Sequence, residues 1–155
     1  MIDIEVEDDA WVAALPDAER LARAAAEAVL AHENEAGGLV VLLTDDASVQ
    51  ALNAQFRDKD APTNVLSFPA APNPEDHLGD VALAFGVCAR EAQAQGKTLA
   101  HHMQHLVAHG VLHLLGYDHM EEAEAETMES LEREILAGLG APDPYGAEQG
   151  DDGRA

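Results

Sequence analysis

The most constraining feature of this sequence is the histidine-rich stretch HHMQHLVAHGVLHLLGYDH, which occupies residues 101–119. It continues a helical stretch that we expect over residues 97–115. Gly116 then ends this helix, because glycine is the usual residue in the left-handed turn after a helix. His109 and His113 are four positions apart, so a helix places them on one face with their Cβ atoms about 6 Å apart. The fold must therefore accommodate a long helix with two imidazoles pointing the same way.

The turn after this helix allows His119 to return to the same face. The spacing His-x3-His-x5-His predicts one metal ion bound by three ligands, His109, His113 and His119. Three protein ligands leave a position for water, which is typical of catalytic zinc sites, and the ion lowers the pKa of that water. We expect one Zn²⁺ per chain, although imidazole also suits nickel, copper and iron. His105 is a candidate fourth ligand or partner, and Asp118 either orients an imidazole or caps the turn.

Two further features bear on the chemistry of such a metal. Gly110 follows His109 directly, where the His-Glu-x-x-His peptidases carry a glutamate base, so a peptidase is disfavoured. The segment RDKD at residues 57–60 is the densest basic spot, and the Arg57 guanidinium can grip a phosphate through two N–H groups. A metal with an arginine suits phosphodiester hydrolysis. Taken alone, however, the segment is more typical of a solvated loop in which its bases pair with its acids.

Composition limits the compartment and the partners. The 155 residues suffice for one domain, and the single cysteine, Cys88, excludes an internal disulfide and suits a reducing compartment. Since neither a signal peptide nor a membrane-length apolar run is present, we expect a cytoplasmic protein without membrane contact. The net charge is −22, but residues 36–120 carry only nine acids against four bases and hold seven of the eight histidines. A polyanion is therefore expected to bind this middle part.

Hydropathy patterns predict an α+β domain over residues 1–140, followed by an acidic, frayed tail at 141–155. Ile2, Ile4 and Val6 alternate with acids, as in a half-buried strand. The other expected strands are 39–44, 65–68 and 79–85, and the expected helices are 16–36, 45–56, 86–95, 97–115 and 121–139.

Three pieces of the sequence resemble a known family. They are LNAQFRDKDAPTNVLSFP at residues 52–69, Leu78-Gly79-Asp80, and HLVAHGVLHLLGYDH at residues 105–119. Their order and spacing are similar to those of the bacterial UPF0054 family, the YbeY-type rRNA maturation factors, over residues 37–140. The resemblance implies a metal-dependent, single-strand-specific endoribonuclease that acts in 16S rRNA 3′-end maturation and ribosome quality control. It also implies a small mixed sheet, with the metal site on the long histidine-bearing helix and the turn after it.

The resemblance assigns the metal to His109, His113 and His119, and the functionally important arginine to Arg57. We expect Arg57 to stabilise charge in the transition state and Lys59 to bind substrate, with either metal-bound water or the RNA 2′-hydroxyl as nucleophile. Expected partners are single-stranded RNA, 16S rRNA, and the small ribosomal subunit or its associated proteins. So acidic a chain should bind free RNA weakly. The alternatives are a ribosome-associated binding factor with a structural metal, and a metal-dependent hydrolase of another substrate.

Overall fold

Four strands form one mixed sheet in the computed structural model, which describes residues 1–118 and 120–145. The strand order is β1-β2-β4-β3, in which β1, β2 and β4 are parallel and β3 runs antiparallel to β4 at one edge. The strands span β1 (Ile2–Val6), β2 (Gly38–Thr44), β3 (Val65–Pro69) and β4 (His77–Ala84). This arrangement confirms the α+β class and the mixed sheet.

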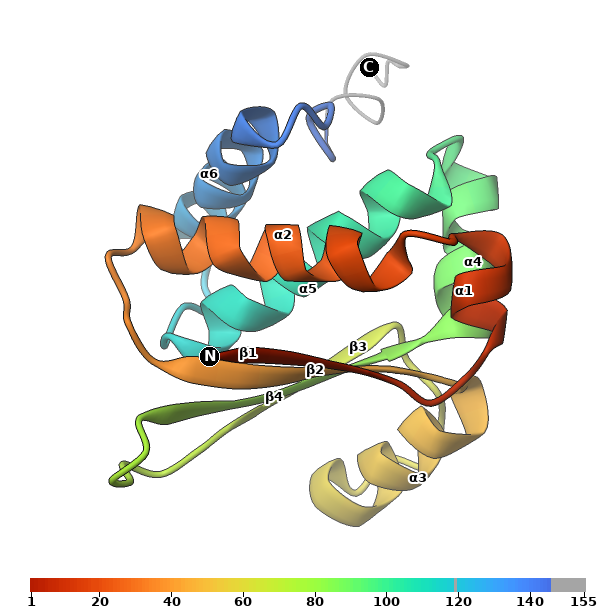
Figure 1. The fold of residues 1–155 in the computed structure, drawn as a ribbon, viewed down its shortest axis with the longest axis horizontal. Coiled ribbons are helices and arrows are strands. Elements are labelled where there is room, and N and C mark those ends of the chain that lie inside the picture. Colours follow the sequence, from red (N-terminus) through yellow and green to blue (C-terminus); the bar gives the residue numbers. More distant parts are fainter. Residues whose placement is uncertain (119, 146–155) are drawn as a thin grey trace.

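The helices cover both faces of this sheet unequally. They are α1 (Ala10–Ala14), α2 (Ala18–His32), α3 (Asp46–Arg57), α4 (Phe85–Gln95), α5 (Leu99–Leu114) and α6 (Glu122–Gly138). Helices α2 and α5 lie over one face with α6 packed beyond them, whereas α3 lies on the opposite face (Figure 1). Among the described residues, no helix is long and apolar enough to span a membrane.

Most elements lie where the sequence pattern predicts them, with two differences near the N-terminus. The helix expected over 16–36 ends at His32, because Asn34 adopts a left-handed conformation with φ 55°. The short helix α1 was not predicted. It is held by Trp11, whose fully buried indole Nε1 donates to the carbonyl of Thr44 at 2.9 Å and whose ring meets Phe85 edge to face.

The main core lies between the sheet and helices α2 and α5. Ile4, Val41, Val81 and Ser67 lie in register across the four strands. Helix α5 approaches this row at Gly110, where an added Cβ would lie 2.6 Å from Val81 Cγ1. The Ser67 hydroxyl also donates to the Gly110 carbonyl at 3.0 Å. The lack of a side chain at this position therefore lets α5 lie directly on β3 and β4.

The single cysteine belongs to this core. Cys88 on α4 is fully buried, and its sulfur lies 3.7 Å from the carbonyl oxygen of Asn64. Burial raises the pKa of the Cys88 thiol, and the nearby acids Glu91 and Asp46 raise it further. The thiol therefore stays protonated, which makes it a poor nucleophile.

Candidate metal centre and adjacent cleft

Helix α5 begins and ends at residues that are typical of helix ends. Gly96 ends the preceding helix with φ 69°, and the Thr98 hydroxyl caps α5 by accepting from the His101 amide at 3.1 Å. After Leu115, Gly116 adopts φ 102°, a conformation that favours glycine. The predicted helix and its glycine stop are thus confirmed. The predicted third ligand, His119, lies outside the described residues.

His109 and His113 face each other on α5, as their spacing predicts. Their Nε2 atoms lie 3.2 Å apart, and their ring planes cross at 80°. Two nitrogens bound to one tetrahedral zinc, each at about 2.0–2.1 Å, are about 3.3 Å apart. The observed separation therefore fits a pair of metal ligands, and neutral imidazole is a common ligand for zinc.

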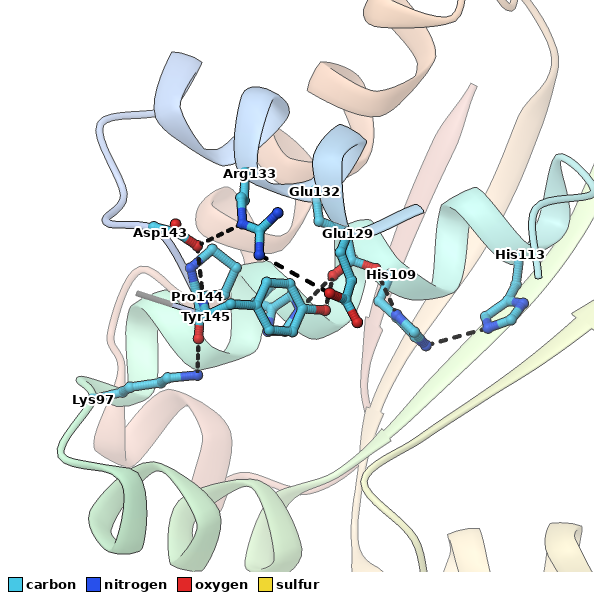
Figure 2. Close-up of polar contacts among 10 residues, drawn as sticks. Lys97, His109, His113, Glu129, Glu132, Arg133, Asp143, Pro144 and Tyr145 are labelled. Carbon is cyan, nitrogen blue, oxygen red and sulfur yellow. Dashed lines mark hydrogen bonds and ion pairs between the residues drawn. The ribbon is translucent and has the colours of Figure 1, made fainter. Parts of the chain in front are cut away.

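A buried carboxylate lies behind this pair. Glu132 of α6 is fully buried, and its Oε2 lies 2.7 Å from His109 Nδ1 (Figure 2). Its Oε1 lies 2.6 Å from His105 Nε2 and 2.5 Å from the Tyr145 hydroxyl. Burial alone would raise the pKa of Glu132, but the hydrogen bonds with His105 and His109 lower this pKa to about 2. Glu132 is therefore ionised at neutral pH and accepts hydrogen bonds through both oxygens.

These side chains form two possible ligand groups that share His109. The first is the predicted group of His109 and His113, whose third member His119 is not described. In the described part of the chain, the group that could hold a metal with all ligand atoms within 4.8 Å of one another is His105, His109 and Glu132. Buried His105 Nδ1 has no hydrogen-bond partner among the described residues. Both groups draw on α5, so the long helix is where a metal would bind.

A cleft of about 740 Å³ opens beside the histidine pair. Its lining includes His109 and His113, the predicted catalytic residue Arg57 and the predicted substrate-binding residue Lys59, together with Ser67 of β3. Asp118 also lines this cleft. The fold thus brings together residues separated by about fifty positions in the sequence, and it does so at the edge of the sheet where β3 passes under α5.

Arg57 is held at the cleft by packing and hydrogen bonding. It is the last residue of α3, and its Nη2 donates to the carbonyl of Ser67 at 2.5 Å while its guanidinium lies over the Phe68 ring. Among the ion pairs of the described residues, none joins Arg57 or Lys59 to the neighbouring acids. Asp60 instead accepts from Gln50 at 3.0 Å. The loop alternative, in which these charges neutralise each other, is not the arrangement seen.

Two residues of this site were missed by the sequence analysis. Glu132 shares the buried stripe of α6 with Met128, Ile135 and Leu136, so an acid stands where helical spacing predicts an apolar residue. This acid at a position where an apolar residue is expected is the sequence signal that could have identified Glu132. Tyr145 lies in the predicted tail, of which residues 141–145 are described and pack against α5 and α6, with Ala141 buried. The rest of the tail lies outside the described residues.

The fold and the site define an α+β protein whose histidine pair, backed by a buried carboxylate, borders a cleft with two cations. Comparison with known proteins identifies the family within this class. The family model described as Endoribonuclease YbeY matches residues 3–140. The chain therefore belongs to the YbeY endoribonuclease family.

Individual relatives agree with this assignment. A protein of Azorhizobium caulinodans named Endoribonuclease YbeY is 55% identical over 152 residues, covering 93% of this chain and 95% of its own. A protein of Paramagnetospirillum magneticum with the same name is 53% identical over 156 residues, covering 94% and 95%. The solution structure of a Thermotoga maritima protein superposes with a TM-score of 0.60 at 28% identity, covering 90% of this chain and 92% of that one.

Proposed function

We propose that this protein is a metal-dependent endoribonuclease that cleaves single-stranded RNA and acts in maturation of the 16S rRNA 3′ end. Membership of the family and the endoribonuclease names of its relatives support the reaction class. The observation that carries the proposal is the position of the two Nε2 atoms of His109 and His113, 3.2 Å apart, on a cleft that Arg57 also lines.

Different side chains of the cleft would bind the metal and the phosphate. His109 and His113, with His119 as the expected third ligand, would hold a zinc ion that supplies a Lewis acid. Arg57 has five N–H donors and uses one at Ser67, so its remaining donors can bind a phosphate and stabilise the charge that develops there. Lys59 adds a second cation to the lining of the cleft, which would help to hold the strand.

Because the chain is so acidic, we expect the RNA to be delivered by another component rather than bound from free solution. A net charge of −22 repels free RNA, since contacts with phosphate dominate such affinity. We therefore propose the small ribosomal subunit, or proteins bound to it, as the platform on which the cytoplasmic enzyme meets single-stranded 16S rRNA. The cations of the cleft then need only to position the strand.

The test compares wild-type protein with His113→Ala on an end-labelled single-stranded RNA, with zinc content recorded for each preparation. His32→Ala is the matched control, because His32, the last residue of α2, pairs with Glu33 and with Glu134 of α6 and is not among the residues that line the cleft. We expect wild type and His32→Ala to bind one zinc and cleave, and His113→Ala to lose both properties. Equal cleavage by all three would reveal a contaminating nuclease and overturn the proposal. Zinc binding without cleavage by the wild type would favour a ribosome-binding factor.

A further inference from the structure

A continuous line of polar contacts runs from the C-terminal segment to the histidine pair (Figure 2). The Tyr145 hydroxyl donates to Glu132 Oε1 at 2.5 Å, and Glu132 Oε2 lies 2.7 Å from His109 Nδ1. The opposite nitrogen of His109, Nε2, lies 3.2 Å from His113 Nε2. The first link joins the segment after α6 to α6, the second joins α6 to α5, and the third lies within α5, which carries both histidines.

This geometry determines which nitrogen of His109 carries the proton. A carboxylate oxygen accepts hydrogen bonds and an imidazole N–H donates them, so the 2.7 Å contact assigns the N–H of His109 to Nδ1. In neutral imidazole the other nitrogen then carries a lone pair, and here that nitrogen is the one facing His113. The same carboxylate receives Nε2–H from His105. Glu132 thus holds two neighbouring histidines in opposite tautomers.

The segment that carries Tyr145 is itself fastened at several points. The Lys97 ammonium donates to the carbonyl of Pro144 at 2.7 Å, and Arg133 Nε donates to Asp143 at 3.2 Å. The Arg133 guanidinium also lies 5.1 Å from the centre of the Tyr145 ring. These contacts place the Tyr145 hydroxyl against the Glu132 carboxylate, which is fully buried. Burying a carboxylate is costly unless its oxygens accept hydrogen bonds.

We propose that Glu132 is a positioning residue that fixes the ring and tautomer of His109 for metal binding, and that Tyr145 holds Glu132 in place. This inference rests on the proposed metal site and assigns a role to two residues outside the predicted ligand set. It also decides between the two ligand groups. Because His109 Nδ1 contacts Glu132, the nitrogen that would bind a metal is Nε2, which lies next to His113 Nε2.

The test uses full-length protein and three single substitutions: Glu132→Gln, Tyr145→Phe and, as a matched control, Glu91→Gln. Glu91 also pairs with a buried α5 histidine, His102, at 2.9 Å, but that histidine is outside both ligand groups. Two properties are measured. The first is the tautomer of each histidine in metal-free protein, read from long-range ¹H–¹⁵N spectra at about pH 8, where ordinary imidazole is neutral. The second is zinc affinity, from competition with a chromophoric chelator.

In metal-free wild type we expect the Nδ1–H tautomer for His109 and the Nε2–H tautomer for His105. Glu132→Gln should give mixed tautomers at His109 and weaken zinc binding by roughly 10- to 100-fold. Tyr145→Phe should change both readouts in the same direction by a smaller factor, and Glu91→Gln should change neither. Because Tyr145→Phe removes one oxygen only, it keeps the test valid if Glu132→Gln does not fold.

Three outcomes would overturn the inference. One is wild-type zinc affinity and an unchanged His109 tautomer in both Glu132→Gln and Tyr145→Phe. Another is loss of zinc from Glu132→Gln while His113→Ala, the variant that tests the proposed function, keeps a full equivalent, which would make Glu132 a ligand together with His105. The third is an Nε2–H tautomer at His109 in the wild type. If wild type binds no zinc, the proposed function fails, but the tautomer measurement still decides the role of Glu132.

Discussion

Arg57 is the residue through which α3, on the far face of the sheet, contributes to the cleft. Its side chain is exposed, yet it is directed by the Ser67 carbonyl and the Phe68 ring. Arg57→Glu replaces the guanidinium that would bind phosphate with a negative charge that repels phosphate. We expect cleavage to fall by about 10²–10³-fold, while zinc content and folding stay unchanged. Single-turnover cleavage assays and elemental analysis check this.

Arg20→Glu is the control for that substitution, because Arg20 is an exposed arginine on α2 that pairs with Asp17. Both variants change the net charge equally, so a general loss of RNA affinity would affect them alike. Normal cleavage by Arg57→Glu would show that the guanidinium has no part in the reaction.

How far single residues could be predicted depended on whether their partners are local. His109 and His113 could be paired from spacing, because one helix fixes their separation. Glu132 could not be assigned to them, since its contact depends on how α6 crosses α5. The role of Arg57 beside the histidines came from the family resemblance, because nothing in its local sequence says that the end of α3 and helix α5 line the same cleft.

At the scale of the element, Gly110 sets how closely α5 lies on the sheet. Gly110→Ala would bring a methyl group to 2.6 Å from Val81 Cγ1 and 3.2 Å from Ser67 Oγ. We expect the free energy of unfolding to fall by about 1–3 kcal/mol, as for other overpacked cores. Urea denaturation followed by circular dichroism measures it.

Gly138→Ala provides the comparison, because Gly138 is also helical but an added Cβ there meets nothing within 4 Å. That change should be neutral or stabilise the protein by up to about 1 kcal/mol. If both glycine substitutions had the same effect, close packing at position 110 would not be the reason for its glycine.

Element boundaries were predictable where a single residue type decides them. Gly96 and Gly116 follow α4 and α5 in left-handed conformations, as expected, whereas α5 begins at Leu99, after the Thr98 cap, and not at residue 97. Helix α1 escaped prediction because it is only five residues long and depends on burial of Trp11. The strand order was not predictable either, because parallel pairing of β1, β2 and β4 depends on how the intervening helices pack.

For the whole molecule, the metal is expected to be dispensable for folding. The main apolar core between the sheet, α2 and α5 is built without the histidines that would bind the metal. We expect zinc removal to leave the helical circular dichroism intact. Occupancy at 100 times Kd stabilises a fold by about 2.7 kcal/mol, so Tm should fall by roughly 5–10 °C.

Thermal scans with and without a chelator test this expectation. Re-addition of zinc should restore the original Tm, whereas magnesium, which prefers oxygen ligands, should not. Complete unfolding on zinc removal would instead identify a structural metal and favour the ribosome-binding alternative.

Because Cys88 is buried, its reaction with alkylating reagents can report local opening of the fold. Cys88 is the only cysteine of the sequence and lies on the buried face of α4, with its sulfur next to the Asn64 carbonyl. We therefore expect alkylating reagents to reach it only when that helix separates from the rest of the core. The alkylation rate in native conditions thus measures the population of the opened form. Asn64 also lines the cleft, so slower alkylation with RNA present would report occupancy of the cleft without an attached label.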